Sequence, residues 1–142
     1  MTRDNVTANT AWESLLAAHA ALTRSFAAEP IWGDLSMREY DVLYTLSKCP
    51  APVRISDLNS HVLLSQPALS RLVHRLAGQG LVKCGPDPVD GRGVLVSLTP
   101  AGRERQRQIG RQHARSVART LTASLSHTEL SQLTSLCQKL HR

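Results

Sequence analysis

Apolar residues recur at helical spacing through most of this chain, and the segments between them contain proline, glycine and helix-capping residues. Residues 10–29 carry apolar and aromatic side chains on one side of a helix, which Pro30 ends. A second helix is expected over residues 36–48, because Ser36 and Glu39 have the spacing of a capping box. The chain therefore begins, by this pattern, with two amphipathic helices joined by a connector.

Two shorter helices are expected in the middle of the chain. Ser56 is placed to cap the first, over residues 57–62, and Ser65 is placed to cap the second, over residues 66–79. Gly80 is a typical residue at the end of a helix. An apolar stripe along the second helix is expected to pack on the body of the domain, and it consists of Leu69, Leu72, Val73 and Leu76.

A two-stranded β-hairpin is expected next, because the apolar runs of residues 81–84 and 94–98 flank a loop rich in proline and glycine. Thr99 then caps a long arginine-rich helix that extends to residue 125, and Ser126 opens a final helix. A helix-turn-helix followed by a hairpin is the winged helix-turn-helix plan. The sequence therefore predicts a mainly α (α+β) fold in which a winged helix-turn-helix lies between terminal helices.

The charge of the chain favours a polyanionic partner. The 142 residues carry a net charge of +6, and arginine supplies 14 of the 17 cationic side chains. Arginine binds phosphates and guanine edges bidentately, so this bias fits nucleic acid. The apolar runs are too short to cross a bilayer and the first residues lack the apolar centre of a signal peptide, so a cytoplasmic protein with no membrane partner is expected.

The outward face of the helix at residues 65–79 suits a DNA major groove. Gln66 can pair with an adenine edge and Ala68 can touch a thymine methyl, while serines and arginines reach phosphates or bases. The alternative is an ordinary solvated basic face, which the neighbouring short helix and hairpin disfavour. The DNA contacts expected from this helix are Ser65, Gln66, Pro67, Ala68, Ser70, Arg71, His74 and Arg75.

The loop "PDPVDGRG", residues 86–93, is expected to be the wing. Arg92 would enter the adjacent minor groove, where negative potential is concentrated. Asp90 would hold the Arg92 guanidinium with charge-assisted hydrogen bonds and so aim it beforehand. The alternative is a plain hairpin loop with an incidental ion pair. Asp87 has no role in this interpretation.

The segment from Leu64 to Arg103 resembles the most recognisable part of the MarR family of bacterial transcription regulators. It contains a recognition helix, a "GLV" strand start, an Asp-x-Arg wing and a "V-x-LT-x-x-G" run. The run "LSMREYDVLYTL" also resembles the family's preceding helix, and the similarity extends over roughly residues 10–142. Family members often have basic residues at the positions of Cys84 and Gly91, so phosphate contacts near the wing are expected to be weaker here.

The resemblance implies a homodimer that binds a palindromic operator in double-stranded DNA in the nucleoid. Many family members repress a neighbouring gene and release DNA when a small ligand binds. The extensive apolar faces of residues 10–29 and 126–142 fit a dimer, because one small domain cannot bury them alone. The expected division is an N-terminal dimerisation helix and connector (1–35), a DNA-binding domain (36–99, with recognition helix about 65–79 and wing about 81–98) and C-terminal dimerisation helices (100–142).

A ligand pocket is expected where the family has it, between the dimer helices and the DNA-binding lobe. A small aromatic or phenolic acid would fit such a pocket, with histidine or arginine at its carboxylate. The alternative is that the same residues belong to the core and the dimer interface. The expected ligand-binding residues are His19, Arg24, Tyr40 and Tyr44, with Trp12 nearby.

Other chemistry finds little support in the sequence. Cys49, Cys84 and Cys137 are scattered, so no disulfide framework or metal site is expected, and packing rather than redox roles is favoured for them. No enzyme motif is present, and no cofactor is expected. The arginines at every fourth position from residue 103 to 119 are expected to form a solvated or interface stripe.

The expected function is therefore a homodimeric DNA-binding repressor that a small ligand releases from DNA. Two alternatives stay open at this point. One is a winged-helix protein-interaction module without specific DNA binding, and the other is a cysteine-based redox-responsive regulator.

Overall fold

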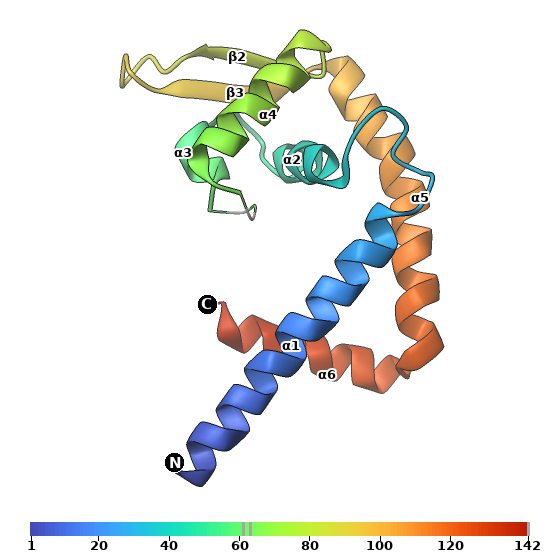
Figure 1. The fold of residues 1–142 in the computed structure, drawn as a ribbon. Helices are drawn as coiled ribbons and strands as arrows, with labels where there is room; N and C mark the ends of the chain where they lie inside the picture. Colours follow the sequence, from blue (N-terminus) through green and yellow to red (C-terminus); the bar gives the residue numbers. More distant parts are fainter. Residues whose placement is uncertain (61, 63, 142) are drawn as a thin grey trace.

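The structure, a computed structural model, describes residues 1–60, 62 and 64–141 (Figure 1). A compact group of helices carries a hairpin that projects to one side, and long helices extend away from this group. The mainly α fold with a small sheet is the one expected from the sequence. Its elements are α1 (Arg3–Ala27), α2 (Met37–Ser47), β1 (Val53–Arg54), α3 (Ile55–Leu58), α4 (Gln66–Gly78), β2 (Val82–Pro86), β3 (Val94–Leu98), α5 (Pro100–Ser124) and α6 (His127–Leu140).

The helix starts expected from capping residues are confirmed for α2, α4, α5 and α6. Ser65 and Thr99 each accept a hydrogen bond from a backbone N–H in the first turn of α4 and α5, at 3.2 and 3.0 Å. Complete capping boxes open α2 at Ser36 and α6 at Ser126. Gly80, which follows α4, has a φ of 74°, a conformation that other residues rarely adopt.

Helix α1 begins at Arg3, earlier than the expected start at residue 10. Its first turns are mostly polar and exposed, so hydrophobic periodicity carries no signal there, but Thr2 caps the helix by accepting a hydrogen bond from the Asn5 N–H at 3.2 Å. In addition, Thr7 and Thr10 donate side-chain hydrogen bonds to backbone carbonyls four residues earlier, at 3.0 and 2.8 Å. Polar residues thus extend the helix beyond its amphipathic part.

The cap expected at Ser56 is wrong. Arg54 is the N-cap of α3 and makes no side-chain hydrogen bond to the helix, and Ser56 lies inside the first turn. The helix ends at Leu58, so the expected span of residues 57–62 is displaced towards the N-terminus, and its residue 61 lies outside the described residues. Because an arginine cannot cap through its own side chain as serine does, the sequence offered no start signal at that position.

The small sheet contains a third strand that the sequence analysis missed. The described strands are antiparallel in the order β1-β3-β2, with Val53 opposite Val96 and Arg54 opposite Leu95. Strand β1 is only two residues long and follows a proline-containing turn, which makes it indistinguishable from a loop by sequence pattern. It attaches the hairpin to the start of α3 and so fixes the wing to the helix-turn-helix.

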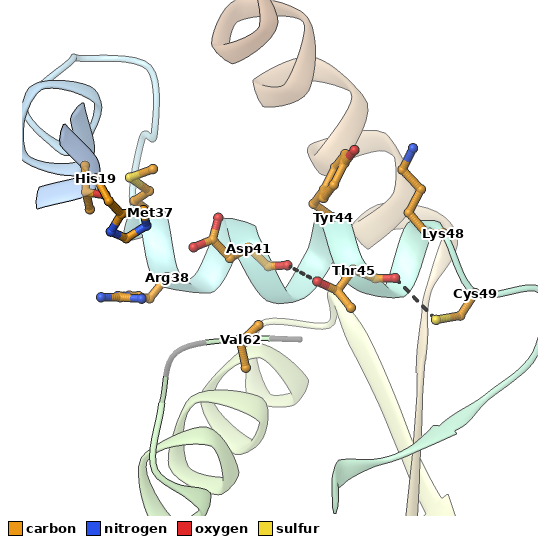
Figure 2. A pocket seen from close by; sticks show the side chains of 10 residues that line it. His19, Met37, Arg38, Asp41, Tyr44, Thr45, Lys48, Cys49 and Val62 are labelled. Atoms are coloured by element: carbon orange, nitrogen blue, oxygen red, sulfur yellow. Dashed lines mark hydrogen bonds between the residues drawn. The ribbon is translucent and has the colours of Figure 1, made fainter. Parts of the chain in front are cut away.

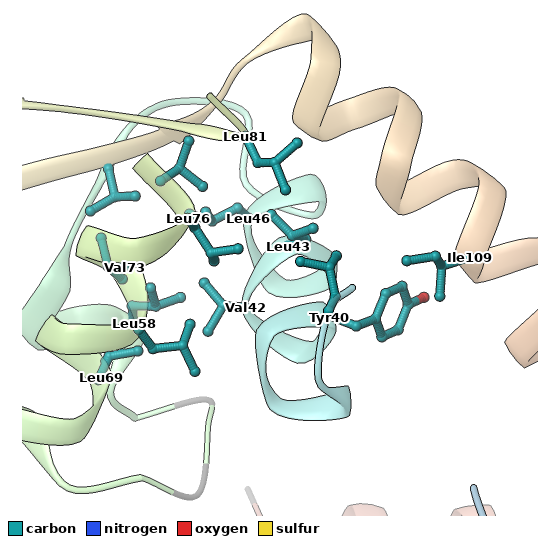
Figure 3. Packing of buried hydrophobic residues seen from close by; sticks show 14 of the residues in the cluster. Tyr40, Val42, Leu43, Leu46, Leu58, Leu69, Val73, Leu76, Leu81 and Ile109 are labelled. Carbon is teal, nitrogen blue, oxygen red and sulfur yellow. The ribbon is translucent and has the colours of Figure 1, made fainter. Parts of the chain in front are cut away.

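The core lies between α2, α4 and the sheet (Figure 3). The apolar stripe expected on α4 is buried there, and Leu69 and Leu76 are completely inaccessible to solvent. Burial of each such leucine contributes roughly 1.5–3 kcal/mol to folding. Ile109 of α5 contacts the same cluster, so the core also holds the beginning of the C-terminal helices against the winged domain.

Helices α1 and α6 present apolar side chains that this single chain does not bury. Trp12, Leu16, Leu136 and Leu140 are exposed, with Leu136 retaining 58% of its accessible surface. No described residue of α6 is buried. These helices therefore carry apolar faces that are open in the isolated chain.

Candidate nucleic-acid interface

Helix α4 turns its polar and basic face away from the core. The packing of Leu69, Leu72, Val73 and Leu76 orients the helix, so that the intervening residues face solvent. Of the eight side chains that the sequence assigns to DNA, Ala68 is half-buried, and the others are exposed, namely Ser65, Gln66, Pro67, Ser70, Arg71, His74 and Arg75. The surface has the accessibility that a DNA contact requires.

The N-terminal half of α4 and the wing meet in one hollow. A depression with a volume of about 310 Å³ is lined by Gln66 and Ser70 of α4, by Asp90 and Arg92 of the wing, and by Arg54 at the start of α3. Arg71, His74 and Arg75 do not line this hollow. The structure therefore joins the beginning of the expected reading helix to the expected minor-groove arginine in one concave basic surface.

Asp90 supports the wing in a different way from the one expected. Its Oδ1 accepts a hydrogen bond from the backbone N–H of Arg92 at 3.1 Å, and its carbonyl accepts one from Gly93 at 2.9 Å. The ion pairs within 4 Å among the described residues do not include Asp90 with Arg92. A short aspartate side chain reaches the N–H two residues on and forms an Asx-turn, so Asp90 shapes the backbone and leaves the guanidinium exposed.

Asp87, which had no role in the sequence analysis, is the buried acid of the wing. Its side chain is 4% exposed, and its Oδ2 lies 2.6 Å from Nε of Arg54. The Oδ1 atom accepts a hydrogen bond from the backbone N–H of Val89 at 2.9 Å. This hydrogen bond, together with the Arg54 charge, holds the pKa of Asp87 below its ordinary value. Sequence spacing could not reveal the partner of Asp87, because Arg54 lies far away in the chain, in the short strand β1.

Arg75 has an intramolecular partner as well as an exposed position. Its Nε lies 3.5 Å from Oε2 of Glu39, the buried capping-box residue of α2. No ion pair within 4 Å is found for Arg71 in the described part of the chain. Arg75 therefore connects α4 to α2, whereas Arg71 is exposed and has no ion-pair partner among the described residues.

A cavity of about 630 Å³ lies beside α2, and it brings together two of the residues expected to bind ligand (Figure 2). His19 of α1 and Tyr44 of α2 line it, and Figure 2 shows His19 beside Met37 and Arg38. The cavity wall also contains ionisable residues that the sequence analysis did not select, namely Arg38, Asp41 and Lys48. Burial raises the pKa of Asp41 above its ordinary value.

Tyr40 and Arg24 do not line that cavity. Tyr40 is buried in an aromatic group, with ring centroids 5.4 Å from Trp32 and 5.6 Å from His113. Arg24 is exposed near the end of α1. Tyr40 and Tyr44 both line a second depression of about 770 Å³ between α2 and α5. The four expected ligand residues therefore do not share one cavity.

His113 is a member of this aromatic group that the sequence analysis did not identify. It packs edge-on to Phe26 at 5.4 Å and against Trp32 at 5.1 Å, and its Nδ1 is buried without a hydrogen-bond partner. Burial lowers the pKa of His113 below its ordinary value. The sequence could not predict this role, because His113 lies on a long arginine-rich helix and its aromatic partners are far away in the chain.

Three further features bear on the other functions considered. The cysteines are free, and partial burial raises the pKa of the Cys84 thiol, which disfavours a reactive thiolate. Among the described residues, no cluster of three His, Cys, Asp or Glu side chains is arranged to hold a metal ion. Within the same residues, no helix combines the length and hydrophobicity needed to cross a membrane.

The fold and this surface together define a winged helix-turn-helix protein in which α4 presents an exposed basic face. A family model described as the MarR family matches residues 33–93. The multiple antibiotic resistance protein MarR of Escherichia coli K12 is 30% identical over 107 residues, which cover 75% of this chain and 74% of that protein. The chain therefore belongs to the MarR family, whose members are transcriptional regulators.

Solved structures agree with this assignment over the whole length of the fold. AbsC, a MarR family transcriptional regulator from Streptomyces coelicolor, is 27% identical with a TM-score of 0.80, covering 99% of this chain and 93% of that one. A mutant MarR from E. coli, complexed with operator DNA, is 26% identical with a TM-score of 0.77, covering 92% of this chain and 93% of that one. The likeness thus includes the terminal helices as well as the winged domain.

Proposed function

We propose that this chain is a homodimeric, sequence-specific DNA-binding regulator that places α4 in the major groove and the wing in the adjacent minor groove. The observation that carries the proposal is the concave basic surface in which Gln66 and Ser70 of α4 face the same hollow as Arg92. A helix in the major groove and an arginine in the minor groove need this juxtaposition. The DNA-bound MarR relative supports the same use of the fold.

Each proposed contact has a distinct role. Gln66, Ala68 and the basic side chains of α4 would read base edges, since amide, methyl and guanidinium groups match different bases in the major groove. Ser65 already accepts a backbone hydrogen bond as the N-cap, so its hydroxyl would donate to a phosphate. His74 and Arg75 lie beyond the hollow and would contact the backbone of the same half-site.

The proposed homodimer accounts for the apolar faces of the terminal helices. Exposed leucines of α6 and the exposed Trp12 and Leu16 of α1 need a partner that covers them. A second copy of the chain would bury them and place two wings with two-fold symmetry. Such a dimer would bind a palindromic operator with half-sites about one DNA turn apart. In this proposal residues 1–35 and 100–142 hold the dimer together, and residues 36–99 bind DNA.

Repression relieved by a small ligand is the proposed mode of regulation. A dimer seated on an operator blocks access to a promoter, and the cavity beside α2 offers a place for a small aromatic or phenolic carboxylate. His19 and Arg38, which lie at the same end of the cavity in Figure 2, would hold the carboxylate, and Tyr44 would pack on the ring. Addition of a hydroxybenzoate to the protein–DNA complex should release DNA, and His19→Ala should abolish that release without reducing affinity for DNA.

A salt titration with the DNA upstream of the gene tests the proposed function. Fluorescence anisotropy would measure the affinity for that fragment and for random DNA of the same length. A steep linear fall of log affinity with log salt is expected, with a preference of about 10³-fold or more for the upstream fragment. Equal affinity for both DNAs, or no binding, would instead favour a winged-helix protein-interaction module.

A further inference from the structure

Arg54 occupies a position where a capping residue is usually found, but its side chain serves another element. It is the last residue of β1 and the N-cap of α3, and it gives α3 no side-chain hydrogen bond. Its Nε instead lies 2.6 Å from the buried carboxylate of Asp87 at the base of the wing. The ion pair therefore crosses from the start of the helix-turn-helix to the wing.

Asp87 is joined to the wing loop at two further points. Its Oδ1 accepts a hydrogen bond from Val89, and its backbone N–H donates to the carbonyl of Gly93 at 3.0 Å. The two sides of the loop approach closely here, because a Cβ at Gly93 would lie 3.1 Å from the Cβ of Asp87 and 3.2 Å from its Oδ2. Asp87 thus forms a neck that holds both sides of the loop together.

The ion pair also lies on the same surface as the proposed DNA contacts. Arg54 lines the hollow that contains Gln66, Ser70 and Arg92, and its side chain remains 43% exposed. Among the described residues, strand β1 pairs with β3 alone, which links the hairpin to the start of α3 through the backbone, and the Arg54–Asp87 pair adds a side-chain link. The base of the hairpin also packs on α4 through β2, so the ion pair adds a constraint close to the loop, beyond the packed part of the hairpin.

We infer that Arg54 is a positioning residue for DNA recognition, which through Asp87 fixes the angle between the wing and α4 and so places Arg92 in the minor groove. This inference rests on the proposed function, because it assigns Arg54 a role in the same interface. A buried carboxylate that loses its cationic partner must take up a proton or move towards solvent. Loss of Arg54 would therefore loosen the contacts of Asp87 at the base of the wing loop, and Arg92 would adopt many orientations.

A double-mutant cycle between Arg54 and Arg92 tests this inference. Affinity for the upstream DNA would be measured for wild type, Arg54→Gln, Arg92→Ala and the double variant. Arg54→Gln is expected to weaken binding about tenfold, and Arg92→Ala should then cost far less in the Arg54→Gln background than in wild type. Arg54→Lys should recover most of the affinity, because an ammonium can still pair with Asp87.

Arg105→Gln is the matched control, since it removes one arginine and one ion pair, to Asp34 at 2.7 Å, away from the wing. It should leave affinity unchanged. Additive losses in the cycle, with the log–log salt slope reduced by about one, would make Arg54 a plain phosphate contact and overturn the inference. Unchanged affinity in Arg54→Gln would overturn it as well.

Amide hydrogen exchange without DNA separates a failure of this inference from a failure of the proposed function. In Arg54→Gln, the amides of Val89, Arg92 and Gly93 should exchange faster, while those in the middle of α4 stay protected. Unchanged exchange in the loop would show that the Arg54–Asp87 pair does not hold the wing, even if the protein binds DNA. If loop exchange is faster but the protein has no affinity for DNA, the structural role of the Arg54–Asp87 pair is supported. In that case the proposed function and the role of Arg54 in recognition are both wrong.

Discussion

Arg75 of the reading helix lies 3.5 Å from Glu39, the residue that completes the capping box of α2. The Glu39 side chain is buried, and its Oε1 accepts a hydrogen bond from the backbone of Ser36 at 3.0 Å. One carboxylate therefore starts α2 and restrains a basic side chain on the surface proposed to contact DNA. This contact links α4, the helix proposed to read DNA, to α2, which packs beneath it.

Arg71 and Arg75 should behave differently when replaced by alanine. Arg71→Ala should weaken binding to upstream DNA by about 1–3 kcal/mol and leave the urea midpoint unchanged, because this side chain has no partner in the described chain within ion-pair distance. Arg75→Ala should lower both the affinity for DNA and the urea midpoint, because it also removes the contact with Glu39. The loss in the free energy of unfolding should be below about 1 kcal/mol. Equal stability of both variants would contradict the role given to the Glu39 contact.

Gly102 is expected to be intolerant of any side chain. A Cβ at this position would overlap the carbonyl oxygen of Leu81 and lie 2.8 Å from its carbonyl carbon, and neither atom can move without shifting the start of β2. Gly102→Ala should destabilise the protein by at least about 1–3 kcal/mol, measured by urea unfolding.

Gly78→Ala provides the matched control for that substitution. Gly78 is also helical, but an added Cβ there meets nothing within 4 Å. Alanine should therefore stabilise the protein by up to about 1 kcal/mol through helix propensity. Destabilisation of similar size in both variants would show that the contact with Leu81 is not the cause.

His113 should make stability depend on pH in the mildly acidic range. Its pKa is lowered from the ordinary 6.5 because burial among Phe26, Trp32 and Tyr40 penalises the charged form, which the facing carboxylates of Asp41 and Glu29 only partly offset. Above pH 6.5, the ordinary pKa of the unfolded chain, His113 is neutral in both states, and folding carries no cost of removing a proton. Stability is lost as the pH falls below this value towards the lowered pKa.

His113→Phe tests this dependence, with His127→Gln as a control at an exposed histidine of α6. Urea midpoints measured between pH 7.5 and pH 5 should fall less in His113→Phe than in wild type, and His127→Gln should follow wild type. An identical pH dependence in all three proteins would remove His113 as the source.

Leu136 should be needed for dimerisation. It is exposed in the single chain and belongs to the apolar face of α6 together with Leu133 and Leu140. Leu136→Glu should shift the protein towards monomer in sedimentation equilibrium and weaken DNA binding at the same time, since a lone winged domain contacts one half-site. Gln138→Glu introduces the same charge on the opposite side of α6, and it should remain dimeric with full affinity.

The sequence predicted those parts of the fold that depend on neighbouring residues. The hydroxyl caps Ser36, Ser65, Thr99 and Ser126 and the apolar stripe of α4 act within one or two helical turns and were found as expected, whereas the cap expected at Ser56 was not. The short strand β1 has no such local pattern, and α1 begins at a hydroxyl cap, Thr2, that the sequence analysis did not use because no apolar periodicity follows it directly. Strand β1 is stabilised by its pairing with β3, and the Thr2 hydroxyl accepts a hydrogen bond from the Asn5 backbone N–H at the start of α1.

In the candidate site, too, the sequence predicted features set by neighbouring residues and missed those set by contacts with distant or backbone groups. The exposure of Gln66, Arg71 and Arg92 follows from periodicity and from a projecting loop, so the sequence was sufficient to predict it. The roles of Asp87 and Asp90 depend on which distant or backbone group each carboxylate meets in the folded chain. The sequence therefore indicated a shaped wing but assigned its shaping to the wrong contact, between Asp90 and the Arg92 guanidinium.

A hydroxyl-radical footprint on the upstream DNA tests the central claim most directly. A dimer that reads DNA through α4 and the wing should protect two segments related by two-fold symmetry, with centres about 10–10.5 base pairs apart or a multiple of that spacing, at low nanomolar to micromolar protein. Arg92→Ala should lose the minor-groove protection beside each segment and keep the rest. Uniform protection along the fragment, or a single unpaired segment with the dimer bound, would contradict a dimer that reads DNA through α4 and the wing.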